Sequence, residues 1–69
     1  MEITPEFSAA LVMVGTALGA GYAIAITGAA AAGATVEKPE VGGKVLILVA
    51  LGEALAIYGL VVALMILMR

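Results

Sequence analysis

The middle of the chain reads Glu37-Lys38-Pro39-Glu40-Val41-Gly42-Gly43-Lys44, and this polar stretch separates two long apolar segments. Before it, positions 7–36 hold no ionisable residue except Tyr22. After it, positions 45–68 hold one charge, that of Glu53. A helix needs about 20 apolar residues to cross about 30 Å of hydrocarbon, so each segment is long enough to span a membrane. Because a proline and a glycine pair are typical of a turn, the sequence predicts a helical hairpin.

The composition agrees with a membrane protein. Of the 69 residues, 65% are hydrophobic and 12% are charged, whereas soluble domains are about half apolar and about a quarter charged. The absence of Cys and His excludes a disulfide scaffold, a zinc module and a Cys or His nucleophile. Three basic against five acidic residues argue against a nucleic-acid partner. We therefore expect an all-α membrane protein without cofactors. Residues 1–69 form one hairpin: a transmembrane helix over 7–36, a polar loop over 37–43 and a second transmembrane helix over 44–69.

The basic residues predict the orientation of this hairpin. Lys38 and Lys44 lie in the loop, and Arg69 is the one basic residue near the termini. Since basic residues favour the cytoplasmic side, we expect a cytoplasmic loop and both termini on the opposite side. A cleaved signal peptide is the competing interpretation of the first segment. Its acidic start and its apolar run, about twice the usual length, argue against that interpretation.

Small residues dominate the first segment. From Gly15 to Ala34, five positions are Gly and nine are Ala, and such residues let membrane helices approach closely. Gly15 and Gly19 form one small face, and a second stripe follows at helical spacing on another side: Ala17, Gly21, Ala25, Gly28 and Ala32. Two small faces predict neighbours on more than one side, hence a homo-oligomer with the first helix innermost. The alternative is that these faces only pack the two helices of one hairpin together.

The second segment has bulkier side chains, which suit an outer, lipid-facing helix. It also has a seam of small residues with a 4-3-4 spacing: Gly52, Ala56, Gly59 and Ala63. Glu53 lies beside this seam, roughly 15 Å from the loop. A charge at mid-bilayer costs about 2.5–3.5 kcal/mol on insertion scales, so this carboxyl is neutral wherever it faces lipid. It releases its proton where water, or an Arg of another protein, reaches it. Glu53 is therefore predicted to carry protons; the alternative is a structural hydrogen bond across helices.

The surroundings expected for Glu53 favour a proton over sodium. If the hairpin is symmetric about the loop, helix residues near Ile26 share its depth. Thr27 is then the nearest hydroxyl, and Tyr22 lies about a turn further out. Tyr58 points about 140° away from Glu53 on the same helix, so it serves only the site of a neighbouring subunit. The chain has no Gln or Asn, and one or two hydroxyls make a poor cage for a sodium ion, which needs several oxygen ligands.

Three stretches carry a resemblance to a known family. The second segment resembles the outer helix of the c subunits, or proteolipids, of rotary ATPases over Glu53-Ala54-Leu55-Ala56-Ile57-Tyr58-Gly59-Leu60-Val61-Val62-Ala63-Leu64. Glu37-Lys38-Pro39-Glu40 is similar to their loop, in which a polar pair precedes Pro-Glu. Their glycine-rich inner helix resembles Ala17-Leu18-Gly19-Ala20-Gly21-Tyr22-Ala23, and here the V/A branch is closer than the F branch.

The resemblance implies a function for the hairpin. Identical hairpins would form a ring whose loops, at Glu37, Lys38, Pro39 and Glu40, attach to a central rotor stalk. Each Glu53 would take up a proton from the stator membrane subunit, turn past lipid and release it, with a stator Arg keeping the passing carboxylate ionised. Such a subunit has no catalytic activity of its own. A two-helix chain favours the cell membrane of a bacterium or archaeon. Two alternatives stay open: a small pore-forming or structural hairpin resembling holins, and an accessory subunit of another membrane complex.

Overall fold

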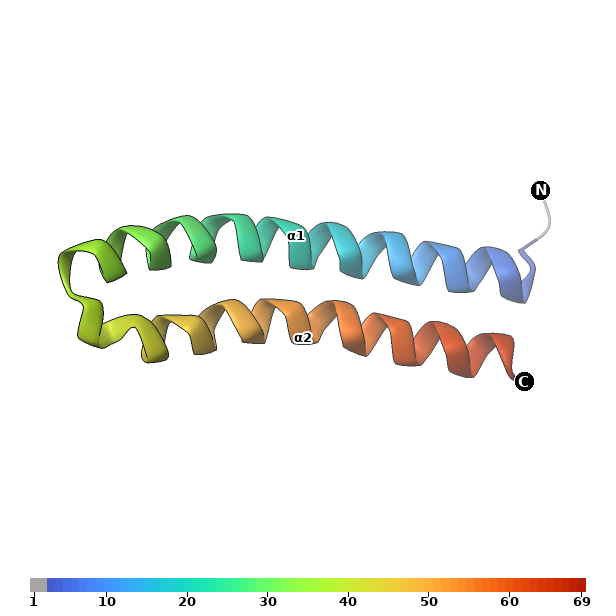
Figure 1. The fold of residues 1–69 in the computed structure, drawn as a ribbon. Coiled ribbons are helices and arrows are strands. Elements are labelled where there is room, and N and C mark those ends of the chain that lie inside the picture. Colours follow the sequence, from blue (N-terminus) through green and yellow to red (C-terminus); the bar gives the residue numbers. More distant parts are fainter. Residues whose placement is uncertain (1–2) are drawn as a thin grey trace.

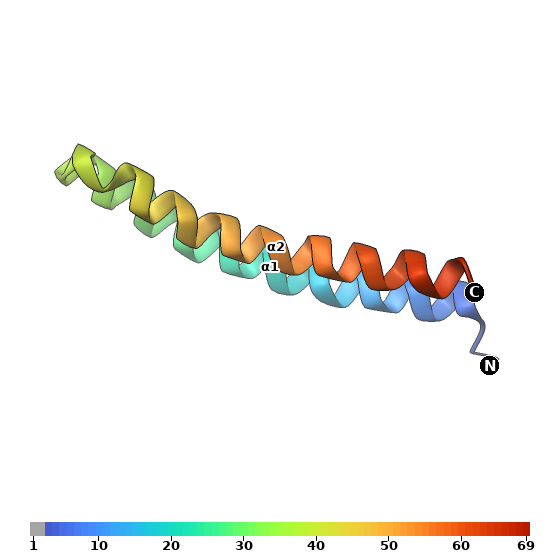
Figure 2. The same ribbon diagram turned by 90° about the horizontal axis from the view of Figure 1, so that it is seen from below.

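The structure, a computed structural model, describes residues 3–69 as two long antiparallel α-helices, α1 (Pro5–Glu37) and α2 (Gly42–Leu67) (Figure 1). A single turn of 3₁₀ helix, η1 (Pro39–Val41), joins them. The Cα atoms extend over 52 × 21 × 7 Å, so the hairpin is one layer of helices with two broad faces. Seen from below, α2 overlies α1 along its whole length (Figure 2). The predicted all-α hairpin is confirmed.

Local capping explains where α1 begins. The Thr4 hydroxyl accepts a hydrogen bond from the Phe7 N–H at 3.1 Å, and Pro5 occupies the first helical turn. A threonine N-cap followed by proline is a favoured helix start, since proline lacks an N–H that would otherwise be unpaired there. The helix therefore begins at Pro5, two residues before the predicted start at position 7.

The chain reverses at Lys38 rather than at the glycine pair. Lys38 leaves the helical region (φ −135°, ψ 87°), because a residue before proline avoids the α conformation. Its N–H still donates to the Ala34 carbonyl at 2.8 Å. Gly42 is already right-handed helical (φ −53°, ψ −42°). The second helix thus begins at Gly42 instead of position 44, and it ends at Leu67 instead of position 69.

Small residues bring the two helices together. Ala9 and Ala20 of α1 and Gly59 and Ala63 of α2 are buried between them. Gly59 faces Thr16 so closely that an added Cβ would lie 2.6 Å from the Thr16 Cβ. The predicted seam of α2 therefore packs against α1 of the same chain, as expected for close helix approach without bulky side chains.

The threonines on the α2-facing side of α1 satisfy their hydroxyls within α1. Thr16 donates to the Val12 carbonyl at 2.9 Å, Thr27 to Ala23 at 2.7 Å and Thr35 to Ala31 at 2.7 Å. These bonds to the residue four positions earlier let a polar side chain sit between membrane helices. Contact between the helices consequently rests on close apolar packing.

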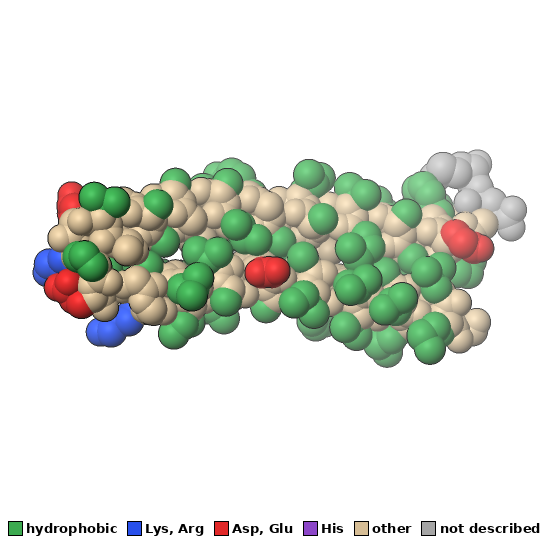
Figure 3. All heavy atoms as spheres, in the orientation of Figure 1, with side chains coloured by type: hydrophobic (Ala, Val, Ile, Leu, Met, Phe, Trp, Pro, Cys, Tyr) green, Lys and Arg blue, Asp and Glu red, His purple; other side chains and the backbone are tan. Residues whose placement is uncertain are grey.

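Most large apolar side chains of the described hairpin are exposed. Both helices are long and apolar enough to cross a membrane. Leu18, Leu46 and Met65 are each more than half exposed, and apolar surfaces of this extent are covered by lipid or by other proteins. Figure 3 shows charged side chains near the two ends of the molecule and, between them, mostly apolar side chains with one acidic group at mid-length.

Candidate functional site

Glu53 lies in the middle of α2 and is exposed. At 1.5 Å per residue it is about 16 Å from Gly42 and about 21 Å from Leu67. Figure 3 shows an acidic group at this level, surrounded by apolar side chains and bare backbone. The structure thus places the predicted carboxyl on an open surface of the hairpin.

Two apolar grooves run along the face that carries Glu53. The groove near the turn has a volume of about 440 Å³ and is lined by Gly28, Ala31, Ala32, Thr35, Val36, Gly42, Val45, Leu46 and Val49. The groove near the termini has a volume of about 360 Å³ and is lined by Glu6, Ala9, Ala10, Met13, Leu60, Ala63, Leu64 and Leu67. Glu53 follows Val49 by one helical turn and precedes Leu60 by two, so it projects from the same side of α2. We call this broad face the Glu53 face and the other the opposite face.

On α1, the Glu53 face is built from the second predicted stripe of small residues. Gly28 and Ala32 line the groove near the turn, and Ala17 and Gly21 continue the same side at spacings of four and seven. Within the described hairpin, a Cβ added to Gly21 or Gly28 would meet no atom within 4 Å. These glycines therefore have room for a partner outside the hairpin.

The glycines of the first predicted stripe lie on the opposite face. A Cβ added to Gly19 would lie 3.4 Å from the Leu55 Cδ2, and one added to Gly15 would meet no atom of residues 3–69 within 4 Å. In contrast, Gly52 packs tightly, since an added Cβ would lie 3.2 Å from the Ala23 Cβ. Helix α1 thus presents small residues on three sides: toward α2, on the Glu53 face and on the opposite face.

The depth expected for Glu53 relative to α1 was wrong by about one turn. Gly52 packs against Ala23 and Ile24, so Glu53 is level with Tyr22 and Ala23, not with Ile26. The cause is that the chain reverses at Lys38, which comes earlier in the sequence than the middle of the predicted loop over residues 37–43.

The hydroxyls proposed to support Glu53 lie elsewhere in the hairpin. Thr27 sits a turn nearer to the loop, and its hydroxyl donates to the Ala23 carbonyl. Tyr22 shares the depth of Glu53 but is 72% exposed and lies about 160° around α1 from buried Ala20. Tyr58 is 69% exposed and about 140° from Glu53, toward the opposite face. Support by Tyr58 for the Glu53 of a neighbouring copy, and support of Glu53 by Tyr22, stay predictions.

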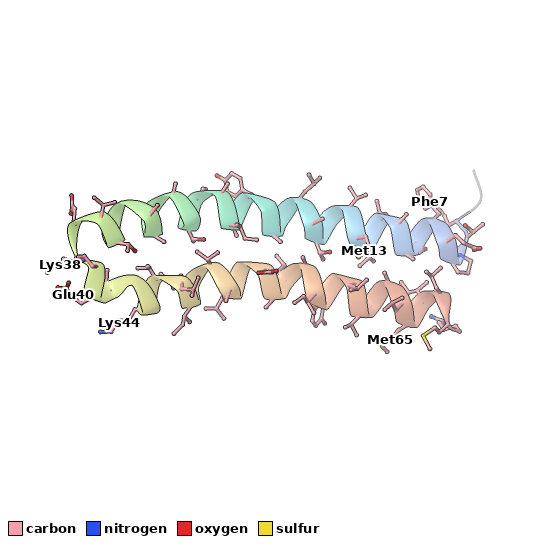
Figure 4. All side chains as sticks on the ribbon, viewed as in Figure 1. Phe7, Met13, Lys38, Glu40, Lys44 and Met65 are labelled. Carbon is pink, nitrogen blue, oxygen red and sulfur yellow. The ribbon has the colours of Figure 1, made fainter. Side chains whose placement is uncertain are left out.

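The loop residues gather at the end of the molecule remote from both termini. Glu37, Lys38, Pro39 and Glu40 are all exposed there, and Figure 4 shows Lys38, Glu40 and Lys44 pointing away from the helices. Thr16, on the other hand, has no distinguishing sequence signal: it is one of several threonines, and its importance comes from lying opposite Gly59.

Comparisons with known proteins agree with this arrangement. A family model for the C subunit of ATP synthase matches residues 7–66. The c''1 and c''2 subunits of the V-type proton ATPase of Arabidopsis thaliana are each 50% identical to this chain over 46 residues. The match covers 67% of this chain and 26% of each plant protein, so the chain spans about a quarter of the length of these relatives. No solved structure matches the chain.

The fold and the site define a two-helix membrane hairpin with a carboxylic acid halfway along one span. The chain belongs to the family of ATP synthase C subunits. This finding confirms the resemblance to the c subunits of rotary ATPases, and the similarity to plant V-type proteins agrees with the predicted branch. A bacterial or archaeal source remains a prediction.

Proposed function

We propose that this chain is a proton-carrying subunit of the membrane rotor ring of a rotary ATPase or ATP synthase. In this role it has no catalytic activity of its own. The observation that carries the proposal is Glu53, an exposed carboxylic acid at mid-span, lying between two apolar grooves in a chain of this family.

The physical chemistry of Glu53 suits reversible protonation. In contact with lipid the neutral acid is favoured, because a charge at the bilayer centre costs about 2.5–3.5 kcal/mol. Next to water, or to an Arg supplied by the stator membrane subunit, the carboxylate is stabilised and the proton leaves. Moving one charge across 100 mV yields about 2.3 kcal/mol, so several protons are needed per ATP. A ring that turns past the stator adds these steps together.

The three small sides of α1 support a ring with α1 innermost. One side is covered by α2 of the same chain, which leaves the Glu53 face and the opposite face for two neighbouring copies. Gly21 and Gly15 provide open space on these two faces. Helix α2 carries exposed Leu46, Ile47 and Leu48 and suits the outer, lipid-facing position.

The remaining partners and the topology follow from the ends of the hairpin. Glu37, Lys38, Pro39 and Glu40 would contact the central rotor stalk, which requires the loop on the cytoplasmic side. Lys38 and Lys44 favour that orientation, and both termini would lie across the membrane. We place the protein in the cell membrane of a bacterium or archaeon.

Protons are the proposed cargo, with sodium the less favoured alternative. One turn from Glu53, the side chains of Val49, Ala50, Ala56 and Ile57 contain no oxygen. The Thr27 hydroxyl is a turn away and already hydrogen-bonded. Sodium requires several oxygen ligands around one point, whereas a proton requires the carboxyl alone.

Replacement of Glu53 tests the proposal in the complete complex. With Glu53→Gln, which keeps shape and hydrogen bonding but has no titratable proton, ATP-driven acidification of vesicles should disappear while the ring keeps its mass. Glu53→Asp retains a titratable carboxyl and should retain part of the transport. Substantial acidification by a pure Glu53→Gln ring would refute the proton-carrying role and favour a structural hairpin.

A further inference from the structure

Two charged residues at the terminal end have no role in the proton-carrying mechanism. Glu6 lies in the first turn of α1 and lines the groove on the Glu53 face. Arg69 lines a different groove of about 370 Å³, together with Ile3, Thr4, Pro5, Ser8 and Ile66. Both residues are exposed.

The two grooves open on opposite broad faces of the hairpin. Glu6 and Ser8, which line one groove each, are about 160° apart around α1. Because the hairpin is a single layer, a groove between its helices opens to one broad face or the other. The carboxylate of Glu6 therefore lies on the Glu53 face, and the guanidinium of Arg69 lies on the opposite face.

The two charges are also at the same depth. Gly59 packs against Thr16, and Gly52 packs against Ala23. Continued to the ends of the antiparallel helices, this register brings Glu6 level with Arg69. Neighbouring copies in a ring are related by a rotation about an axis parallel to the hairpin, so each residue has the same depth in every copy. When the Glu53 face of one copy meets the opposite face of the next, Glu6 in α1 of one copy and Arg69 after the end of α2 of the next lie at the same height across the interface.

We propose that Glu6 of each copy forms an ion pair with Arg69 of the adjacent copy, closing the ring interface on the side of the termini. This inference rests on the ring assembly proposed above. The contact is heterologous, so every copy uses both of its charges and the pairs repeat around a closed ring. Carboxylate and guanidinium form two parallel hydrogen bonds when they meet in one plane. Charge pairs at the edge of an interface contribute mainly to register and partner choice, and here they would hold neighbouring Glu53 side chains at one depth.

Cysteine pairs test this contact directly, because the chain has no natural cysteine. The double variant Glu6→Cys/Arg69→Cys, oxidised in the assembled ring, should give a ladder of dimers, trimers and larger products in denaturing gels. The control Ser8→Cys/Arg69→Cys places both thiols in one groove of one chain and should give monomers with an internal disulfide. The same variant is also treated with a bismaleimide, whose spacer covers the length of a Glu–Arg pair, because a disulfide forms only where the two Cα atoms lie within about 7 Å. If neither treatment yields a ladder in rings of unchanged mass, the ion pair is refuted while the proposed function stands.

Charge reversal provides a second measurement that does not depend on disulfide geometry. Glu6→Arg and Arg69→Glu should each lower the temperature at which the detergent-solubilised ring dissociates, and the double reversal should restore most of the loss. High salt should reduce the effect, since exposed pairs are screened. If Arg69→Glu weakens the ring equally with and without Glu6→Arg, Arg69 instead binds another anion, such as a lipid phosphate, and the pairing is wrong.

Discussion

The contact between Gly59 and Thr16 leads to a quantitative prediction for Gly59→Ala. The new methyl carbon would lie 2.6 Å from the Thr16 Cβ and 2.7 Å from its Cγ2, whereas carbon atoms normally approach to about 3.5–4.0 Å. The helices must therefore separate locally by about 1 Å. Overpacking of this kind costs about 1–3 kcal/mol, which corresponds to about a 5- to 150-fold larger population of opened hairpin.

A matched control isolates this cost from the helix propensity of alanine. Gly43→Ala lies on the same helix, and its methyl group would meet no atom of the described hairpin within 4 Å. The difference between the two variants therefore measures the contact with Thr16. A suitable assay is SDS titration in mixed micelles, with fluorophores at positions 3 and 68, near the two ends of the chain. The N- and C-terminal ends lie at the same end of the molecule (Figure 1). Thr16→Gly combined with Gly59→Ala should restore stability. Equal stability of Gly59→Ala and Gly43→Ala would refute the packing described for this seam.

Three further predictions concern assembly, the transported ion and the start of α1. Gly21→Leu should leave the hairpin folded but break the ring into smaller species, measured by native mass, because it fills space reserved for a neighbour; an intact ring would show that Gly21 is not at an interface. Sodium at constant pH should not protect Glu53 from modification by a carbodiimide, and protection would indicate a sodium site. Thr4→Ala should cost about 1 kcal/mol through loss of the N-cap, seen as faster amide exchange at Phe7; unchanged exchange would contradict the cap.

The sequence alone was sufficient for the overall fold because the two apolar segments and the Pro39 turn leave little choice. It did not reveal how the helices pack, because α1 is lined by Gly and Ala on nearly every side. Two stripes were recognised by their spacing, yet α2 packs on a third side, around Ala20 and Thr16. No pattern in α1 distinguishes that side. It is determined by the size of the α2 side chains that lie opposite the α1 residues.

The register of the hairpin was missed for a related reason. A polar loop of several residues can reverse at any of them, and the expected depth assumed a hairpin symmetric about the predicted loop over residues 37–43. In the structure Pro39 itself ends α1 by its effect on Lys38, and Gly42 continues into α2. This shift moves Glu53 from the expected level of Ile26 to that of Tyr22. Glu53 could be identified as the candidate site without knowledge of the register, because it is the one charged residue within positions 45–68.

The proton-carrying role of Glu53 is tested most directly by mapping carbodiimide modification in the assembled ring by mass spectrometry. Carbodiimides react with protonated carboxylic acids, and of the acidic residues in α1, η1 and α2, Glu53 alone lies in the middle of a membrane span. We predict that the label is found on Glu53, not on Glu6, Glu37 or Glu40 near the ends. Its rate should fall as the pH rises and the carboxyl ionises. A ring in which Glu53 stays unlabelled, or reacts at a rate independent of pH, would contradict a carboxyl that gains and loses a proton.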